Sequence, residues 1–180
     1  MPVIRVAALM TCHNRVASTI QSVRSLKSQT VAGVVVDLFL VDDGSSDGTA
    51  QAVLEVFPQA TILTGDGNLF WCGGVRWAFK EAICKEYDFY FWLNDDTILD
   101  EGALARMLDT YRAASRVACD AAIIVGSTRD PRTGLFTYGG WSRYLTPTGL
   151  ISWKQTPPRM DVPLSCDTMN GNCVLISKSV

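Results

Sequence analysis

Residues 34–49 of the chain read VVVDLFLVDDGSSDGT, and this stretch decides the fold class. Its first eight residues are apolar and β-branched with one interruption, which is the composition of a strand buried in a sheet. The strand gives way to a polar turn at Asp42, and a helix is predicted over residues 50–57, with Ser46 or Asp47 at its N-terminus. A buried strand, a polar turn and a capped helix in this order predict one half of a strand–helix–strand crossover.

The same alternation continues on both sides of this stretch. Apolar runs predict further strands, and apolar residues that repeat every three to four positions predict further helices. The predicted strands cover residues 3–10, 60–63, 89–93, 121–125 and 173–176, and the predicted helices cover residues 16–27, 75–83 and 104–111. Strands separated by helices of this length are typical of right-handed crossovers in a parallel sheet. We therefore predict an α/β fold with a mostly parallel central sheet, helices on both of its faces and a Rossmann-like N-terminal half.

Residues 126–163 follow a different pattern, because five of the seven prolines lie there. Proline cannot donate a backbone hydrogen bond, so loops are predicted, with one hairpin around residues 135–141. The sequence contains no internal repeat, heptad pattern or low-complexity segment. The chain is therefore interpreted as a single domain over residues 1–180.

Composition and charge argue against several classes of protein. Apolar residues make up 48% of the chain and charged residues 19%, which is typical of a folded globular domain. The net charge of -2 leaves no large basic surface, so nucleic acid is not expected as a partner. The longest apolar run, at residues 89–93 for example, has five residues, whereas a membrane-spanning helix needs about twenty. The first residues lack the features of a secretion signal, and a cytoplasmic location is expected.

Four polar clusters follow the predicted strands. Ligands of open α/β sheets bind beyond the carboxyl ends of the parallel strands, so these clusters are predicted to meet at one edge of the sheet. They are residues 11–14, 42–49, 65–68 and 94–97. Three of them contain carboxylates although charged residues are scarce, which indicates a binding site at this edge.

The cluster Asn94-Asp95-Asp96 is the clearest candidate. Two adjacent carboxylates repel each other unless a cation or a hydrogen-bond donor lies beside them. Mg²⁺ or Mn²⁺ would supply that cation, since one strand-end aspartate, a diphosphate and water complete a magnesium site. The alternative is that Asp95 and Asp96 only form a turn and cap the helix that begins near Asp100.

The cluster Asp42-Asp43-Gly44 also allows two interpretations. It can be only a turn that leads into a capped helix. In the other interpretation a carboxylate accepts the imide N–H of a pyrimidine, and the small neighbouring residues leave room for the base. Two acidic strand ends at one sheet edge favour the functional interpretation of both clusters.

Three motifs, in this order and at these separations, resemble the GT-A fold glycosyltransferases of family 2. They are Thr11-Cys12-His13-Asn14-Arg15, residues 41–49 (VDDGSSDGT) and Asn94-Asp95-Asp96. Residues 67–74 (GNLFWCGG) and 169–172 (MNGN) resemble most closely the bacterial rhamnosyltransferase-like branch. The string DDGSSDGT is highly specific, and the resemblance covers nearly the whole chain.

The resemblance implies the GT-A fold and transfer of a sugar from a nucleotide-diphosphate sugar to an acceptor hydroxyl, with inversion at the anomeric carbon. It implies a hexosyltransferase of bacterial surface polysaccharide synthesis, acting on a saccharide or lipid-linked saccharide. Such an enzyme is expected in the cytoplasm, either free or peripherally at the inner face of the membrane. Residues 1–125 would form the nucleotide-sugar-binding half, and residues 126–180 the start of an acceptor half.

Position within the motifs assigns the donor-binding residues by resemblance. Thr11 and His13 would border the nucleoside. Asp43 would accept a hydrogen bond from the base, and Asp95 would face the ribose. Asp96, the last carboxylate of a DxD-like motif, would bind Mg²⁺ or Mn²⁺ on the diphosphate.

Two further residues bear on the diphosphate. Asn94 replaces the first acid of a strict DxD motif, so a single metal carboxylate is expected. Arg76 lies close behind Gly73-Gly74 in a predicted helix and is a candidate to add positive charge near the phosphates. The alternative is a solvated or carboxylate-paired arginine.

The general base is not identified. Inverting transfer needs a group that takes the acceptor proton, and the resemblance places it beyond Val180. A C-terminally truncated chain with weak or no transferase activity is therefore expected. The alternatives are a non-catalytic nucleotide-sugar or partner-binding module and a sugar-nucleotide pyrophosphorylase, although residues 11–15 lack the glycine-rich basic loop of the latter.

Overall fold

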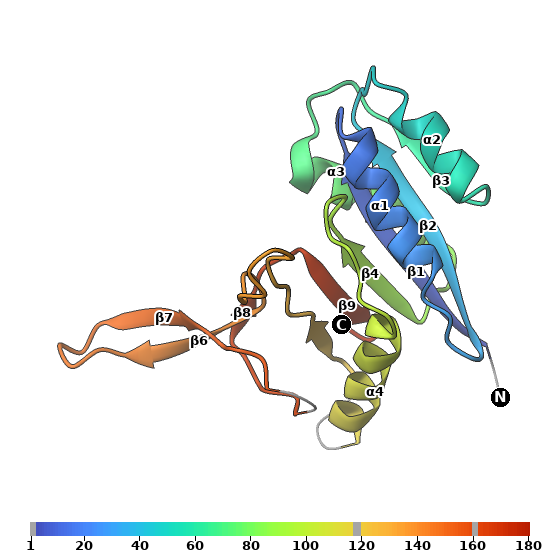
Figure 1. Ribbon diagram of the computed structural model, residues 1–180. Coiled ribbons are helices and arrows are strands. Elements are labelled where there is room, and N and C mark those ends of the chain that lie inside the picture. Colours follow the sequence, from blue (N-terminus) through green and yellow to red (C-terminus); the bar gives the residue numbers. More distant parts are fainter. Residues whose placement is uncertain (1–2, 117–119, 160–161) are drawn as a thin grey trace.

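A computed structural model of the chain describes residues 3–116, 120–159 and 162–180. Within these residues a six-stranded sheet has the order β3-β2-β1-β4-β9-β5, and a smaller sheet has the order β7-β6-β8 (Figure 1). The strands of the larger sheet are β1 (Ile4–Cys12), β2 (Val34–Asp42), β3 (Thr61–Thr64), β4 (Phe89–Leu93), β5 (Ile123–Val125) and β9 (Cys173–Ser177). The helices are α1 (Val16–Lys27), α2 (Thr49–Val56), α3 (Phe70–Ile83) and α4 (Ala103–Ser115).

The larger sheet is mostly parallel. β1 pairs in parallel with β2 and β4, and β2 pairs in parallel with β3. β9 pairs antiparallel with both β4 and β5, so it lies between two strands that precede it in the chain. The carboxyl ends of β1 to β4 therefore share one edge, and β9 begins at that same edge. The predicted α/β fold is confirmed.

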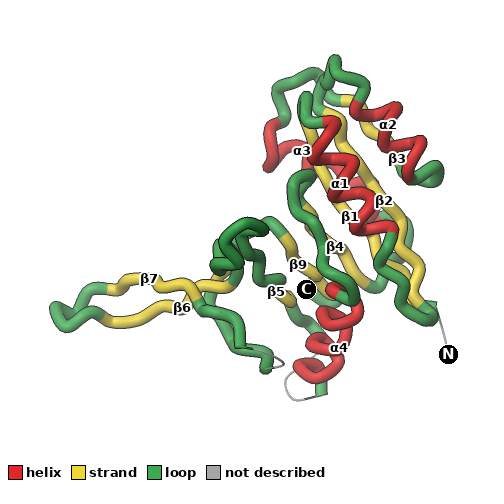
Figure 2. Tube along the Cα trace, in the orientation of Figure 1, coloured by secondary structure: helices red, strands yellow, loops and turns green. Residues whose placement is uncertain are grey.

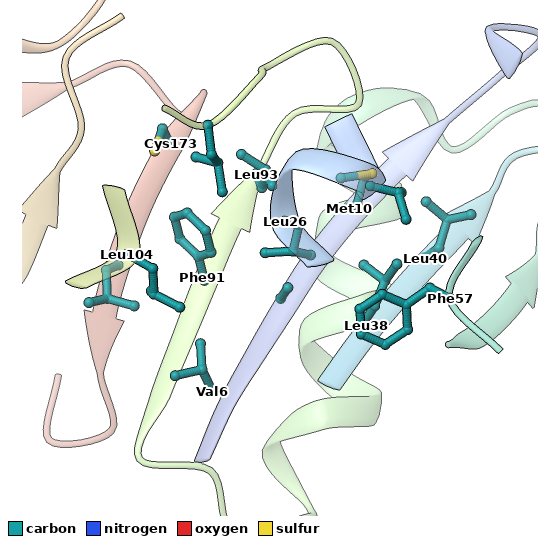
Figure 3. Close-up of a cluster of buried hydrophobic side chains, with 14 of the residues drawn as sticks. Val6, Met10, Leu26, Leu38, Leu40, Phe57, Phe91, Leu93, Leu104 and Cys173 are labelled. Atoms are coloured by element: carbon teal, nitrogen blue, oxygen red, sulfur yellow. The ribbon is translucent and has the colours of Figure 1, made fainter. Parts of the chain in front are cut away.

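Helices cover both faces of the sheet, as predicted. β1 is apolar on both sides because alternate residues enter two different hydrophobic clusters. Val6 and Met10 lie in the cluster that also holds Leu26 of α1 and buried residues of α2 and α4 (Figure 3). Leu9 lies in the other cluster with Ala78 of α3. Burial of a leucine side chain contributes about 1.5–3 kcal/mol, so this packing holds the end of β1 firmly in place.

The predicted hairpin around residues 135–141 is only partly correct in its position, because a short antiparallel turn pairs Arg129 with Phe136. A longer hairpin follows, formed by β6 (Gly140–Leu145) and β7 (Ile151–Gln155) and extended by β8 (Thr168–Met169), and it projects from the rest of the chain (Figure 2). Gly149 closes its turn: its N–H donates to the Thr146 carbonyl at 2.9 Å, and its φ of 79° favours glycine. This turn fixes the pairing of β6 with β7.

The other elements lie close to the predicted ranges. α1 has the predicted bounds, α2 and α4 differ by a few residues, and β5 is shorter than the predicted strand at 121–125. The largest difference is α3, which begins at Phe70 instead of residue 75. Over residues 3–116, 120–159 and 162–180, the structure contains no helix with the length and hydropathy of a membrane span.

Candidate active site

The four polar clusters meet at one edge of the sheet, as predicted. The loop after β1 contacts its neighbours on both sides, since the Asn14 N–H donates to Ser45 Oγ at 2.9 Å and Arg15 reaches the loop after β4. The loop after β2 contacts the loop after β3, because the Asp42 carbonyl accepts from the N–H of Gly65 at 2.8 Å. Parallel pairing ends β1, β2 and β4 at this edge, so the sheet topology itself gathers these side chains.

Asp43 is buried at this edge, directly after β2. Its Oδ1 accepts from the N–H of Gly67 at 2.8 Å. Its Oδ2 accepts from the N–H groups of Leu69 at 2.9 Å and Phe70 at 3.0 Å. One carboxylate thus holds the loop after β3 and satisfies donors at the N-terminus of α3.

This contact explains why α3 begins earlier than predicted. Asp43 precedes Phe70 by 27 positions, so the capping group comes from another strand. Hydrophobic periodicity and local capping signals report only neighbouring residues. A helix start fixed by a distant carboxylate therefore gave no signal in the sequence.

His13 and Thr11 contact the residues that adjoin this loop, Asp43 and Gly74. His13 Nδ1 lies 2.5 Å from the Asp43 carbonyl oxygen, so Nδ1 carries the proton and donates. Its Nε2 then accepts from Asn14 Nδ2 at 3.0 Å. Thr11 packs against Gly74 of α3 so closely that a Cβ at residue 74 would overlap the threonine side chain. The first motif is thereby fixed against both β2 and α3.

Asp47 links the beginnings of two helices. Its Oδ2 accepts from the N–H of Val16, the first residue of α1, at 3.0 Å. Its Oδ1 accepts from the N–H of Thr49, the first residue of α2, at 3.1 Å. The hydrogen bond from the Thr49 hydroxyl and these backbone donors lower the pKa of Asp47. Asp47 is one of the two predicted caps of α2; the N-cap position is Gly48, and Asp47 lies one residue before it and binds the first N–H of both α1 and α2.

Arg15 bridges the two aspartates that follow β4. Its Nη1 donates to Asp95 Oδ1 at 3.1 Å, and its Nη2 donates to Asp96 Oδ2 at 2.9 Å. The Asp95 side chain is 7% exposed, whereas that of Asp96 is 42% exposed. A guanidinium therefore supplies the positive charge that two adjacent carboxylates require. We predicted the need for a cation but assigned no role to Arg15, although it closes the first motif.

Asp95 is the more perturbed of the two acids. Burial raises its pKa above the usual value of 3.8, and the nearby Arg15 charge opposes that rise. Thr19 also points a hydroxyl at Asp95 Oδ2, at 3.4 Å. The two acids thus differ in environment: Asp95 is a buried, paired group, and Asp96 is open to solvent.

Trp71 connects residues 67–74 and 169–172 to this edge of the sheet. Its Nε1 donates to Asn94 Oδ1 at 2.8 Å. Its ring lies against Gly171, where a Cβ would come within 2.7 Å of the indole. The Asn172 carbonyl accepts from the N–H of Asn94 at 3.0 Å. Residues 67–74 and 169–172 therefore both meet at the amide that precedes the aspartate pair.

Arg76 is the predicted site residue that the structure connects least. It is exposed on α3. Among the described residues it forms no hydrogen bond or ion pair with Thr11, His13, Asp43, Asp95 or Asp96. The contacts that gather the other five predicted residues and their loops at the edge do not include it.

The aspartates fit a divalent cation that is shared with a ligand. The described residues contain no group of three or more His, Cys, Asp or Glu side chains that would enclose a metal. Mg²⁺ commonly uses one or two carboxylates and completes its shell with substrate phosphates and water. Asp96 suits that arrangement because it is exposed and because its Oδ1 has no hydrogen-bond partner among the described residues.

A groove with a volume of about 430 Å³ lies at the opposite edge of the sheet. It is lined by Ile4 and Phe89, at the starts of β1 and β4, and by Ser177, at the end of β9. The ion pair between Lys178 and Asp88, at 2.9 Å, lies in its wall. None of the predicted site residues lines this groove. It is therefore separate from the acidic edge, which is the edge of the sheet that carries Asp43, Asp95 and Asp96.

Comparison with known proteins identifies the family. The model of glycosyl transferase family 2 matches residues 7–164. The chain therefore belongs to glycosyl transferase family 2. No curated protein sequence matches the chain.

Solved structures agree on the fold. TarS of S. aureus (residues 1–349) is similar with a TM-score of 0.53 and 17% identity, over 67% of this chain and 34% of that chain. The complex of TarS with UDP-GlcNAc has a TM-score of 0.53 and 18% identity, and the match covers 67% of this chain and 33% of that chain. The mannosyltransferase PcManGT from Pyrobaculum calidifontis, in complex with GDP-Man and Mn²⁺, has a TM-score of 0.53 and 18% identity. That match covers 73% of this chain and 37% of that chain. The fold is GT-A, and the chain spans about a third of the length of these proteins.

Proposed function

We propose that the chain binds a nucleotide-diphosphate sugar at the acidic edge and belongs to an inverting glycosyltransferase. The observation that carries this proposal is the Asp95–Asp96 pair, held by Arg15 beside the loop that Asp43 anchors. Family membership supports sugar transfer, and two of the similar solved structures hold GDP-Man with Mn²⁺ or UDP-GlcNAc. Because the chain spans about a third of those proteins, donor binding is the activity to test first.

The nucleoside end of the donor is assigned to the loops after β1 and β2. Asp43 Oδ2 already accepts two backbone donors, and Oδ1 accepts one. A carboxylate oxygen has two acceptor sites, so Oδ1 retains one for a base N–H. Thr11 and His13 are assigned to the borders of the nucleoside, and Asp95 is assigned to the ribose.

The diphosphate end is assigned to Asp96 and Arg15. A divalent ion bound there would stabilise the negative charge that develops on the departing nucleoside diphosphate. Asp96 would hold that ion through its exposed carboxylate, with Mg²⁺ or Mn²⁺ as the expected species. Arg15 would keep the bond from Nη1 to Asp95 and turn Nη2 toward a phosphate oxygen, because charge-assisted hydrogen bonds from a guanidinium to phosphate are strong. Arg76 is kept as a weaker candidate for the same charge.

Calorimetry with UDP, dTDP and GDP in the presence and absence of Mn²⁺ tests this proposal. Wild type is expected to bind at least one of them with Mn²⁺-dependent affinity. Asp96→Ala is expected to lose the Mn²⁺-dependent part, about tenfold or more, because the diphosphate loses its bridging cation. Asp109→Ala, which removes an exposed carboxylate from the surface of α4, is the matched control and is expected to bind like wild type.

The result separates the proposal from its rivals. Equal affinity of wild type and Asp96→Ala would remove the metal assignment and favour a non-catalytic nucleotide-sugar-binding module. Family membership favours transfer over the pyrophosphorylase alternative. We further propose residues 1–125 as the donor half and residues 126–180 as the start of the acceptor half.

The subclass is proposed from the motifs around Trp71 and Gly171, which suggest a rhamnosyltransferase-like member acting in surface polysaccharide synthesis. Thermal shift with dTDP-rhamnose, UDP-GlcNAc and GDP-mannose tests it. A donor at 100 times its dissociation constant stabilises by about 2.7 kcal/mol. Stabilisation by dTDP-rhamnose above the other two is expected, and preference for another donor would reject the subclass.

A further inference from the structure

The hairpin of β6 and β7 carries apolar side chains outward at its tip. It projects away from the rest of the molecule (Figure 1). Leu145, Leu150 and Ile151 are 72%, 68% and 60% exposed. Leu145 and Ile151 are directly paired across the two strands, so they form one continuous patch. Large aliphatic side chains gathered at the end of a projecting hairpin indicate a surface that is covered in use.

An aromatic level lies directly behind this tip. Tyr144 precedes Leu145, and Trp153 lies two residues after Ile151. Both aromatic side chains are exposed. Tyrosine and tryptophan combine an apolar ring with a polar group, and they are enriched where a protein passes from an apolar to an aqueous environment.

Basic side chains begin at the height of Trp153 and continue one residue behind it. Arg143 is paired with Trp153 across the hairpin, and Lys154 Nζ lies 5.8 Å from the centroid of the Tyr144 ring. Arg143 and Lys154 are both exposed. Residues 140–156 contain two basic and no acidic residues in a chain whose net charge is -2, and the carboxylate of Asp167 accepts from the Arg143 N–H at 2.8 Å.

The spacing of these levels matches the surface of a bilayer. A strand rises about 3.4 Å per residue, so Arg143 lies about 7 Å behind Leu145. Interfacial protein segments bury their apolar side about 5–10 Å into the boundary between headgroups and acyl chains. An apolar tip followed by a zone of aromatic and basic side chains matches the order of acyl chains and anionic headgroup interface. We propose that this hairpin docks the protein on an anionic lipid bilayer, with Leu145, Leu150 and Ile151 inserted.

The base of the hairpin adjoins the candidate site. Trp141, at the start of β6, donates from Nε1 to Asn170 Oδ1 at 2.8 Å. The neighbouring Gly171 lies against Trp71, which is hydrogen-bonded to Asn94. Docking would therefore hold the acidic edge near the bilayer, which favours a lipid-linked acceptor. This last step rests on the proposed function, whereas the docking itself does not.

Vesicle cosedimentation tests the docking without any donor. The probes are vesicles of phosphatidylcholine alone and with 30% phosphatidylglycerol, at low and high salt. Wild type is expected to bind the anionic vesicles and to be weakened by salt. Arg143→Gln/Lys154→Gln is expected to lose about fivefold in partitioning for each charge removed. Leu145→Ser/Leu150→Ser/Ile151→Ser is expected to lose about tenfold or more on both kinds of vesicle.

Matched variants outside the hairpin serve as controls. Lys80→Gln/Arg132→Gln removes two exposed charges, and Ile83→Ser/Ile98→Ser/Leu135→Ser removes three exposed apolar side chains. Both controls are expected to bind vesicles like wild type. In addition, quenching of tryptophan fluorescence by brominated lipid is expected to fall in Trp153→Phe, because Trp153 lies at the interface.

Three results would overturn the proposal. They are absence of wild-type binding to anionic vesicles, unchanged binding of both hairpin variants, and loss of self-association in the tip variant without any vesicle binding. The last result would identify a second copy of the chain as the occupant. Donor calorimetry on the same variants is expected to be unchanged, so a failure of docking is distinguishable from a failure of the proposed donor site.

Discussion

Arg15 and Asp96 form an ion pair at 2.9 Å, and the same guanidinium reaches the buried neighbour Asp95. The loop after β1 is thereby tied to the loop after β4 through the side chains proposed to bind the diphosphate end of the donor. The pair also means that a positive charge already occupies the space between the acids before any ligand arrives. Arg15 is therefore expected to affect both stability and metal binding.

Arg15→Gln is expected to destabilise the protein by about 1 kcal/mol at pH 7, a value reduced by the half-exposed position of Arg15. The loss is expected to be smaller at pH 4. Burial raises the pKa of Asp95 and Arg15 opposes the rise, so the substitution raises that pKa further. A raised folded-state pKa contributes stability below the unfolded value, and this contribution is lost as the pH rises through the folded pKa.

Urea unfolding at pH 4 and pH 7 checks this dependence. Arg112→Gln is the matched control, because Arg112 pairs with Asp109 on one exposed helix surface. It is expected to cost about 0.3–0.5 kcal/mol or less at either pH. An equal loss for Arg15→Gln at both pH values would show that Asp95 does not depend on Arg15.

The same Arg15→Gln substitution is expected to strengthen Mn²⁺ binding to the nucleotide-free protein about fivefold. The guanidinium competes with the metal for Asp96, and a half-exposed ion pair of about 1 kcal/mol corresponds to that factor. Nucleoside diphosphate binding in the presence of Mn²⁺ is expected to weaken, because Arg15 no longer meets the phosphates. Calorimetry measures both affinities in Arg15→Gln, and they are expected to change in opposite directions. A change of both affinities in the same direction would contradict the proposed role of Arg15.

Asp43→Asn is expected to destabilise the protein by about 2–4 kcal/mol. The amide keeps one acceptor oxygen, while its NH₂ group faces backbone N–H donors that the carboxylate had satisfied. Hydrogen exchange is expected to accelerate at the amides of Gly67, Leu69 and Phe70. Asp66→Asn is the control, because Asp66 is exposed in the same loop and accepts from the N–H of Asn68 and not from the three measured amides. Unchanged exchange in Asp43→Asn would contradict the anchoring contact.

Asp47→Asn is expected to reduce stability at neutral pH and to have little effect in acid. Its pKa is lowered by the Thr49 hydroxyl and by backbone donors. A lowered folded-state pKa contributes stability above the unfolded value of 3.8, and this contribution is lost as the pH falls through the folded pKa. Urea unfolding between pH 2 and pH 7 measures the difference from wild type. Asp109→Asn, on the exposed surface of α4, is the matched control.

Helices and strands with a clear local sequence pattern were predictable from the sequence. β2 and β4 are apolar runs that end at carboxylates, and α1 shows a clear helical period, so the fold and the acidic edge followed from pattern alone. The start of α3 did not follow, because Asp43 supplies its cap from another strand. The position of the β6–β7 hairpin depended on one turn among many glycines and prolines, and the sequence offered several such turns.

Within the candidate site, the aspartates were predictable and their partner was not. The adjacent acids Asp95 and Asp96 at the end of β4 indicate that a positive charge lies beside them, but the sequence does not identify the group that carries this charge. Arg15 precedes Asp95 by 80 positions, and only the parallel pairing of β1 with β4 brings them together. The contact of Trp71 with Gly171 is similarly non-local, so motif position alone could not reveal it.

The insertion of β9 between β4 and β5 bears on how the nascent protein matures. Until residues 173–177 leave the ribosome, β4 presents one unpaired edge with its backbone groups open to other chains. The sheet cannot be completed cotranslationally in order from the N-terminus, because its interior position is filled by a late segment. Chaperone protection during synthesis would therefore matter most for β4, the strand that leads into the aspartate pair.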